Sequence, residues 1–137
     1  MTLDERQLAV ILQASIDRAQ EMLVESGGFL PFGARARIDG GVEFLEPEGL
    51  GADETLDELY RRIGALLAGE AGRREILAAT LVANAALPGP AGETAIAVQI
   101  EAPEFCRSVI VPYRLIGEVV ELGRMIPEQA DPVVFSA

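Results

Sequence analysis

The chain has 137 residues, of which eleven are arginine and twenty-two are acidic, and its formal net charge is −11 at pH 7. It has neither histidine nor lysine, so it lacks the usual general base near neutral pH and the residue that forms Schiff bases. This composition excludes Ser-His-Asp and Cys-His catalytic sites, HExxH zinc sites and Walker-type lysines, and the acidic balance disfavours nucleic acid and anionic membranes as partners.

Half of the residues are hydrophobic, which is enough for a folded core, and the length predicts one domain over residues 1–137. The single cysteine, Cys106, cannot form an intrachain disulfide and fits a reducing compartment. The acidic N-terminus does not resemble a signal peptide, and the apolar stretch at 76–87 is too short to span a bilayer. We therefore expect a soluble cytoplasmic protein.

A helix is predicted over residues 3–25. The tetrad Thr2-Leu3-Asp4-Glu5 has the form of a capping box, and apolar residues then recur at helical spacing. A glycine pair follows the helix, and glycine commonly ends helices because it adopts the left-handed conformation readily.

A β-hairpin is predicted next, with strands over residues 29–38 and 42–46 and a turn at 39–41. Burial of the apolar face, a three-residue loop containing glycine and a favourable cross-strand charge pair all favour the same register. This register pairs Ile38 with Val42, Ala36 with Phe44 and Arg37 with Glu43.

A second helix is predicted from residue 55. The tetrad Thr55-Leu56-Asp57-Glu58 repeats the capping box, a clean apolar stripe follows, and glycines at 69 and 72 end the helix. Residues 76–87 fit a helix by their alanine and leucine content and a strand by their flanking turns. We favour a strand, because the segments after it in the chain are clearly β.

Residues 94–101 and 106–115 are predicted strands, because the first alternates apolar and polar residues and the second is rich in β-branched ones. A turn at 88–92 precedes them. In the tail, residues 119–122 fit a short strand or helix, and the apolar residues 133–135 could dock on the body of the protein or on a partner.

The predicted order is helix, two strands, helix, three strands and tail. Helices of this length need a sheet to cover, so we expect the α+β class, with a single antiparallel sheet of about five strands and two helices packed on one face. This connectivity resembles that of roadblock and profilin-like domains. The similarity is one of topology, and fold does not fix function.

Residues 27–34 read Gly-Gly-Phe-Leu-Pro-Phe-Gly-Ala, and Asp39-Gly40 and Pro112-Tyr113-Arg114 come later in the chain. In these motifs the chain resembles a group of small uncharacterised bacterial proteins that share a GGFxPFGA…DG hairpin and a late PYR. The motifs cover a small part of the chain. The resemblance implies a single bacterial domain and no particular activity.

Two aromatic residues around a proline, beside a glycine that admits close approach of a backbone, could form the floor of a ligand pocket. Arginines on strands could bind a carboxylate or phosphate through two hydrogen bonds. The candidate ligand-binding residues are Phe29, Phe32, Arg35, Tyr113 and Arg114. The alternative is structural: Phe32 belongs to the core, Gly33 relieves crowding, and the arginines pair with acids such as Glu101 and Glu104.

Acidic residues gather at the end of the hairpin and in the loop after it. The candidate partner-binding residues are Glu43, Glu46, Glu48 and Asp53. Their spacing lacks the alternating pattern of an EF-hand, so we expect no metal site. They fit either a solvated loop or a docking surface for a basic protein.

No residue stands out as catalytic. Cys106 begins a strand, and a thiolate would need an electropositive neighbourhood that the sequence does not provide, so we expect an inert thiol. No pair of carboxylates stands out from the acidic background, and we expect no cofactor.

The sequence therefore predicts a non-enzymatic protein-interaction or regulatory domain with a basic protein partner. We expect it to form a homodimer, because it has β-rich edges, an apolar tail and a surface rich in leucine and alanine. The alternative is a small-molecule sensor with a pocket between residues 29–32 and the helices. An enzyme that relies on carboxylates, arginine or Tyr113 ranks last.

Overall fold

The computed structural model describes residues 5–87 and 93–135. Within them, helices α1 (Glu5–Ser26) and α2 (Leu56–Gly72) accompany one antiparallel sheet of seven strands, whose order is β2-β1-β3-β4-β5-β6, with β7 also paired to β5. The strands are β1 (Phe32–Arg37), β2 (Val42–Leu45), β3 (Ile76–Ala86), β4 (Thr94–Ala102), β5 (Phe105–Ile116), β6 (Val119–Leu122) and β7 (Ile126–Glu128). The α+β class and the single antiparallel sheet are confirmed.

The sheet has more strands than the five expected, because β5 has two partners on the same side. At 12 residues, β5 is long enough to pair with β7 near Val109 and with β6 near Leu115. The segment at 119–122 is thus a strand rather than a helix. The sequence did not indicate β7, since three residues that include a proline carry no readable alternation.

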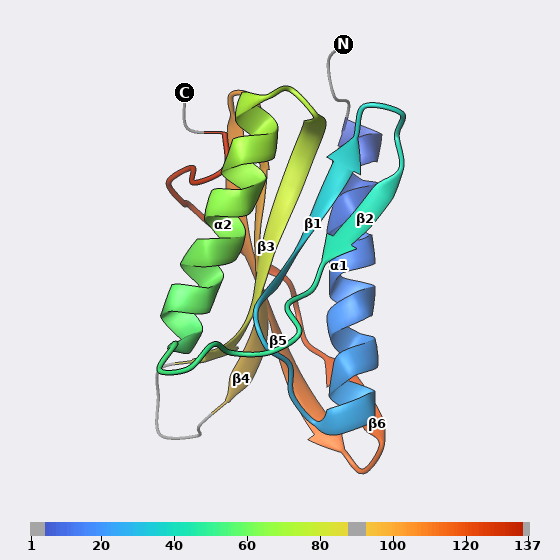
Figure 1. Ribbon diagram of the computed structural model, residues 1–137. Coiled ribbons are helices and arrows are strands. Elements are labelled where there is room, and N and C mark those ends of the chain that lie inside the picture. The colour runs from blue at the N-terminus through green and yellow to red at the C-terminus, as the bar shows by residue number, and fades with distance from the viewer. Residues whose placement is uncertain (1–4, 88–92, 136–137) are drawn as a thin grey trace.

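The helices lie on opposite faces of the sheet, as Figure 1 shows, so the expectation that both cover one face is wrong. Strand β3 explains the arrangement. Ala78 and Val82 belong to the apolar clusters under α1, whereas Ala79 and Leu81 belong to the cluster under α2. A strand buried on both sides reads as a continuous apolar run, which is why its sequence did not distinguish strand from helix.

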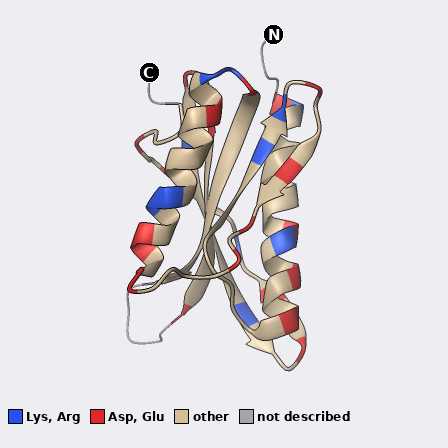
Figure 2. Cartoon of the chain, viewed as in Figure 1, with Lys and Arg blue, Asp and Glu red and all other residues tan. Residues whose placement is uncertain are grey.

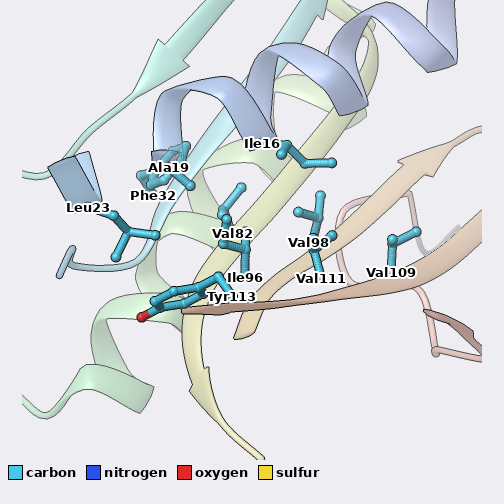
Figure 3. Close-up of a cluster of buried hydrophobic side chains, with 10 residues drawn as sticks. All are labelled: Ile16, Ala19, Leu23, Phe32, Val82, Ile96, Val98, Val109, Val111 and Tyr113. Carbon is cyan, nitrogen blue, oxygen red and sulfur yellow. The ribbon is translucent and has the colours of Figure 1, made fainter. Parts of the chain in front are cut away.

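The core between α1 and the sheet is built from aliphatic groups and two buried aromatic rings, those of Phe32 and Tyr113. Figure 3 shows side chains of α1 above Ile96 of β4 and valines that come from β3, β4 and β5. At its centre lies Phe32, which is fully buried. Beside this cluster, the buried Ser15 hydroxyl lies 2.7 Å from that of Thr80, so a polar contact joins α1 to β3.

Helix α2 packs very closely on β1 at Gly33. A Cβ atom at this position would lie 3.0 Å from Leu67 Cδ1, 3.0 Å from the carbonyl oxygen of Thr80 and 3.1 Å from Ile63 Cγ2. The missing side chain of Gly33 therefore makes room for α2, in agreement with the structural reading of this glycine.

The ends of α2 follow from its sequence in part. The Thr55 hydroxyl accepts a hydrogen bond from the Glu58 amide at 3.1 Å, so the expected cap is present. The glycine at 69 does not end the helix, which continues to Gly72. The first capping box begins outside the described residues, as does the turn predicted at 88–92.

The hairpin forms with a register different from the one expected. Ala36 pairs with Val42 and Ala34 with Phe44, so β2 is shifted by two residues along β1. The three-residue loop begins one residue earlier, at Ile38, and ends at Gly40, whose φ of +93° suits the left-handed position. Because the shift is even, every side chain keeps its expected face.

No helix among the described residues is long and apolar enough to cross a membrane.

Candidate functional site

The predicted aromatic residues belong to the core rather than to a shared pocket. Phe29 packs edge-on against Phe32, with ring centroids 5.7 Å apart, and Phe32 has no exposed surface. The ring of Tyr113 is buried in the same cluster, where its hydroxyl donates a hydrogen bond to Asn84 Oδ1 at 2.7 Å. Phe32 and Tyr113 therefore belong to the core, while Phe29 lines one hollow and Tyr113 borders a different one, so the three do not share a pocket.

The predicted arginines lie on the same face of the sheet but far from each other. Arg35 on β1 lies opposite Ala79 on β3. Ala79 in turn lies opposite Glu101 on β4, and Glu101 lies opposite Cys106 on β5. Arg114 lies eight residues further along β5, which corresponds to about 26 Å at the usual rise of a strand. The two side chains therefore cannot bind one small ligand.

Each arginine has a different environment. The Arg35 guanidinium donates to Glu70 on α2 at 2.9 Å and also contacts Glu43 at 3.4 Å. Arg114 is exposed and lines a hollow of about 250 Å³ with Glu121. The expectation that strand arginines pair with Glu101 is wrong, because Glu101 is bound by backbone amides of the tail.

The hollow at Phe29 lies between the start of α2, the segment before β1 and the end of β3. Its volume is about 390 Å³, and its polar groups include the side chains of Tyr60 and Asn84. Burial raises the pKa of the Tyr60 phenol to about 12, so this group carries its proton at neutral pH and cannot act as a base. The acidic residue Asp57 also lines the hollow, which therefore offers apolar walls, two neutral hydrogen-bonding side chains and one acidic side chain.

Two of the predicted partner-binding acids are neutralised by arginine. Glu43 contacts Arg35 and lies 2.7 Å from Arg37, and Glu46 forms an ion pair with Arg18 that ties β2 to α1. The Arg37–Glu43 pair was expected and forms diagonally despite the shifted register. Glu43 thus links β2 to β1, and Glu46 links the end of β2 to α1, while both add to the acidic charge of the surface.

The other two predicted acids, Glu48 and Asp53, line an open hollow of about 1010 Å³ in the loop before α2. Its best-fixed group is Glu54, which accepts two hydrogen bonds of 3.0 Å from Arg62 and one from the Gly51 amide. These donors hold the pKa of Glu54 below its usual value. Among the described residues no group of three or more acids or cysteines is placed to hold a metal ion.

Cys106 faces the same side of the sheet as Glu101, its partner on β4. Burial, then the negative charges of Glu101 and Asp131, raises the pKa of its thiol. The raised pKa keeps the sulfur protonated near neutral pH, which makes it a weak nucleophile.

Sequence reasoning missed the most open apolar surface. On the α2 side, one row of side chains crosses four strands through successive register partners: Ala83, Ala97, Ile110 and Ile126. We call this row the open sheet face. None of its four side chains is fully buried, and Ile126 is 45% exposed. Helix α2 packs on β1 and β3, so it does not reach across the row.

The open sheet face extends toward the β5–β6 hairpin, where Ile116 and Val119 are paired and are 55% and 64% exposed. Figure 2 shows that charged residues concentrate on the helices and loops, while β3 and β4 are almost free of them. A signal was present in the sequence: two of the four β4 residues that alternate with its buried isoleucines and valine are alanine, namely Ala95 and Ala97.

Comparison with protein-family models, with curated proteins and with solved structures finds no match to this chain.

Proposed function

We propose that this protein is a non-enzymatic protein-interaction domain that docks a basic protein on its open sheet face. The observation that carries the proposal is the uneven covering of the sheet. α1 packs on β1, β3, β4 and β6, whereas the main contacts of α2 on the other side are with β1 and β3. Uncharged side chains from four adjacent strands are left at the surface, and such a contiguous apolar surface is typical of interaction sites.

The chemistry of the remaining groups favours binding over catalysis. The two groups best placed to react, the Cys106 thiol and the Tyr60 phenol, both have raised pKa values and so keep their protons at neutral pH. A docking surface needs no such group, since shape and apolar contact supply most of its free energy.

The net charge of −11 favours a basic partner. Acids at the rim attract such a partner over a distance, while the uncharged row provides the contact. Glu121 and Glu128, which lie on the strands at the edge of the open sheet face, are exposed and suit this role.

The proposal is tested by affinity capture from native lysate with three baits: the natural chain, Ile110→Glu and Leu66→Glu. Ile110 lies in the open sheet face, whereas Leu66 is an exposed residue of α2 that serves as the matched control. Both variants add the same charge. We expect one basic protein to be retained by the natural chain and by Leu66→Glu, and to be lost with Ile110→Glu.

High salt should weaken the capture, because rim charges are screened. Circular dichroism of each bait verifies that it is folded. Identical captured proteins with all three baits would show that the open sheet face is not the docking surface.

The hollow beside Phe29 favours a second candidate function, that of a small-molecule sensor. Its volume of about 390 Å³ falls in the range of ligand sites, and Tyr60 and Asn84 provide hydrogen-bonding groups. A ligand at a hundred times its dissociation constant stabilises a protein by about 2.7 kcal/mol, which a thermal-shift screen of metabolites detects. A shift seen in the natural chain and absent in Phe29→Ala would support this function, and equal shifts would oppose it.

A further inference from the structure

The last described segment of the chain, residues 131–135, is held by one buried carboxylate. Glu101 is 1% exposed and accepts hydrogen bonds from three successive backbone amides, those of Val133, Val134 and Phe135, at 2.8–3.0 Å. Gln99 adds two more contacts, since its amide nitrogen lies 2.8 Å from Glu101 and 2.9 Å from the carbonyl oxygen of Asp131. No arginine takes part in these hydrogen bonds.

The same segment inserts one side chain into the core. Val134 is 4% exposed and belongs to the cluster of α2 and β3, while Val133 stays 43% exposed. A Cβ atom at Gly64 of α2 would lie only 3.1 Å from Val133 Cγ1, so the helix has a seat shaped for the segment. Figure 1 shows the red C-terminal segment beside α2. We call this seat, lined by Gly64, Gln99 and Glu101, the tail groove.

The tail groove therefore recognises two features of an extended peptide. The Glu101 carboxylate accepts hydrogen bonds from the peptide's backbone amides, and an apolar socket takes one small aliphatic side chain. The segment in it belongs to no helix or strand. Only one of its side chains is fully buried, so its gains from burial and hydrogen bonding are of the same order as the cost of ordering five residues. Such a segment opens at a low free energy compared with the core.

A short link joins the segment to the sheet. Residues 129–130 connect it to β7, a strand of three exposed residues that pairs only with β5. Exchange of an identical segment between two copies of a chain is a low-cost route to a dimer, and the hinge for such an exchange would be this link. The closed monomer and the exchanged dimer make the same contacts, so protein concentration and the link decide between them.

We propose that residues 131–135 exchange between two copies of the chain, each tail occupying the tail groove of the other, to form a homodimer. The seated segment itself shows what the groove accepts, and a second copy offers an identical segment. The proposal does not rest on docking at the open sheet face, because the tail groove is lined by other residues.

Two complementary variants of the full chain test the exchange. Glu101→Gln leaves the tail unchanged but replaces the carboxylate that accepts its three backbone N–H groups by an uncharged side-chain amide, so the groove of this variant binds a tail more weakly. Val134→Asp keeps the groove but places a charge in the apolar socket, so its tail is impaired. Native mass spectrometry and sedimentation equilibrium measure the association of each variant alone, of their equimolar mixture and of the natural chain.

We expect the natural chain to dimerise, each variant alone to associate at least about tenfold more weakly, and the mixture to give a heterodimer joined by one intact tail in one intact groove. A mixture that stays monomeric where the natural chain is dimeric would overturn the proposal, as would a natural chain that is monomeric at every concentration. If either variant fails to fold, Gly64→Leu replaces the groove variant and Phe135→Asp the tail variant.

Discussion

The two halves of the sheet handle charge and burial differently. All eight ion pairs found among the described residues lie within residues 18–75, where arginines join the helices to β1, β2 and the loop before α2. None lies within residues 93–135, although this part carries Arg107, Arg114 and Arg124. Strands β1 and β3 are also covered by a helix on each face, whereas β4 and β5 pack under α1 on one face.

The difference shows how a small acidic protein can leave an apolar surface accessible. In the first half, acids form ion pairs with arginines, and helices cover both faces of β1 and β3. In the second half, the only fully buried charged group among the described residues is Glu101, and it binds the tail rather than an arginine. The uncharged side chains of the open sheet face remain partly exposed, which is the condition for docking.

The largest effect should come from the covered core. Phe32→Ala removes a fully buried ring and should lower the free energy of unfolding by about 4 kcal/mol. Ile110→Ala, on the open sheet face, should cost less than about 1 kcal/mol, because its side chain is only half-buried. Urea denaturation measures both. Equal losses would mean that the open sheet face is part of the core, and the contrast between the halves would fail.

A second effect should come from the close contact of α2 with β1. Gly33→Ala forces a methyl group to within 3.0 Å of the Thr80 carbonyl oxygen and should cost about 2 kcal/mol. Gly28→Ala is the control, since its methyl group would meet only Asn84 Nδ2 at 3.7 Å and should change stability by less than about 0.5 kcal/mol. A neutral Gly33→Ala would show that α2 can move away from the sheet.

A smaller effect should follow from loss of the tail anchor. Glu101→Gln should cost about 1 kcal/mol, because the tail can leave its groove and limit the penalty. Hydrogen exchange should become fast at the amides of Val133, Val134 and Phe135 and stay slow in β3. Unchanged protection of these three amides would show that the tail is held by its apolar side chain alone.

The smallest effect should come from exposed ion pairs. Arg62 and Arg73 hold the pKa values of Glu54 and Glu75 below their usual values, so these carboxylates contribute stability above their unfolded pKa. That contribution is lost as the pH falls through the lowered folded pKa. Glu75 is exposed, and Glu54 is partly buried but bound to the exposed Arg62, so solvent screens both pairs and the loss should be slight. The urea midpoint, measured from neutral to acidic pH, should depend less on pH in Glu54→Gln, and an unchanged dependence would contradict this.

Much of the fold could be predicted, because patterns within short stretches of the chain indicated most of its helices and strands. The capping residue Thr55 and the apolar stripe defined α2, and alternation defined β4. The hairpin register was wrong by two residues, because an even shift keeps every side chain on its face and burial therefore cannot choose between the two registers. The strand β7 was missed because it is too short for any pattern.

The candidate site was less accessible to prediction. Arg35 and Tyr113 were predicted to bind a ligand because of their side-chain chemistry. In the structure Arg35 forms an ion pair with Glu70, and the Tyr113 hydroxyl is hydrogen-bonded to Asn84. The alanines and isoleucines that form the open sheet face do not stand out in a sequence. Glu101 looked like an ordinary acid because its partners are backbone amides more than thirty residues away.

The sequence by itself determined both helices and most of the strands, the acidic charge and the depletion of catalytic residue types, because helix caps, periodicity and composition act within short stretches of chain. Only the tertiary structure decided which acids are neutralised, which strands lack a helix and where the tail lies. These depend on side chains brought together across the sheet, and for them the spacing along the chain carries no information.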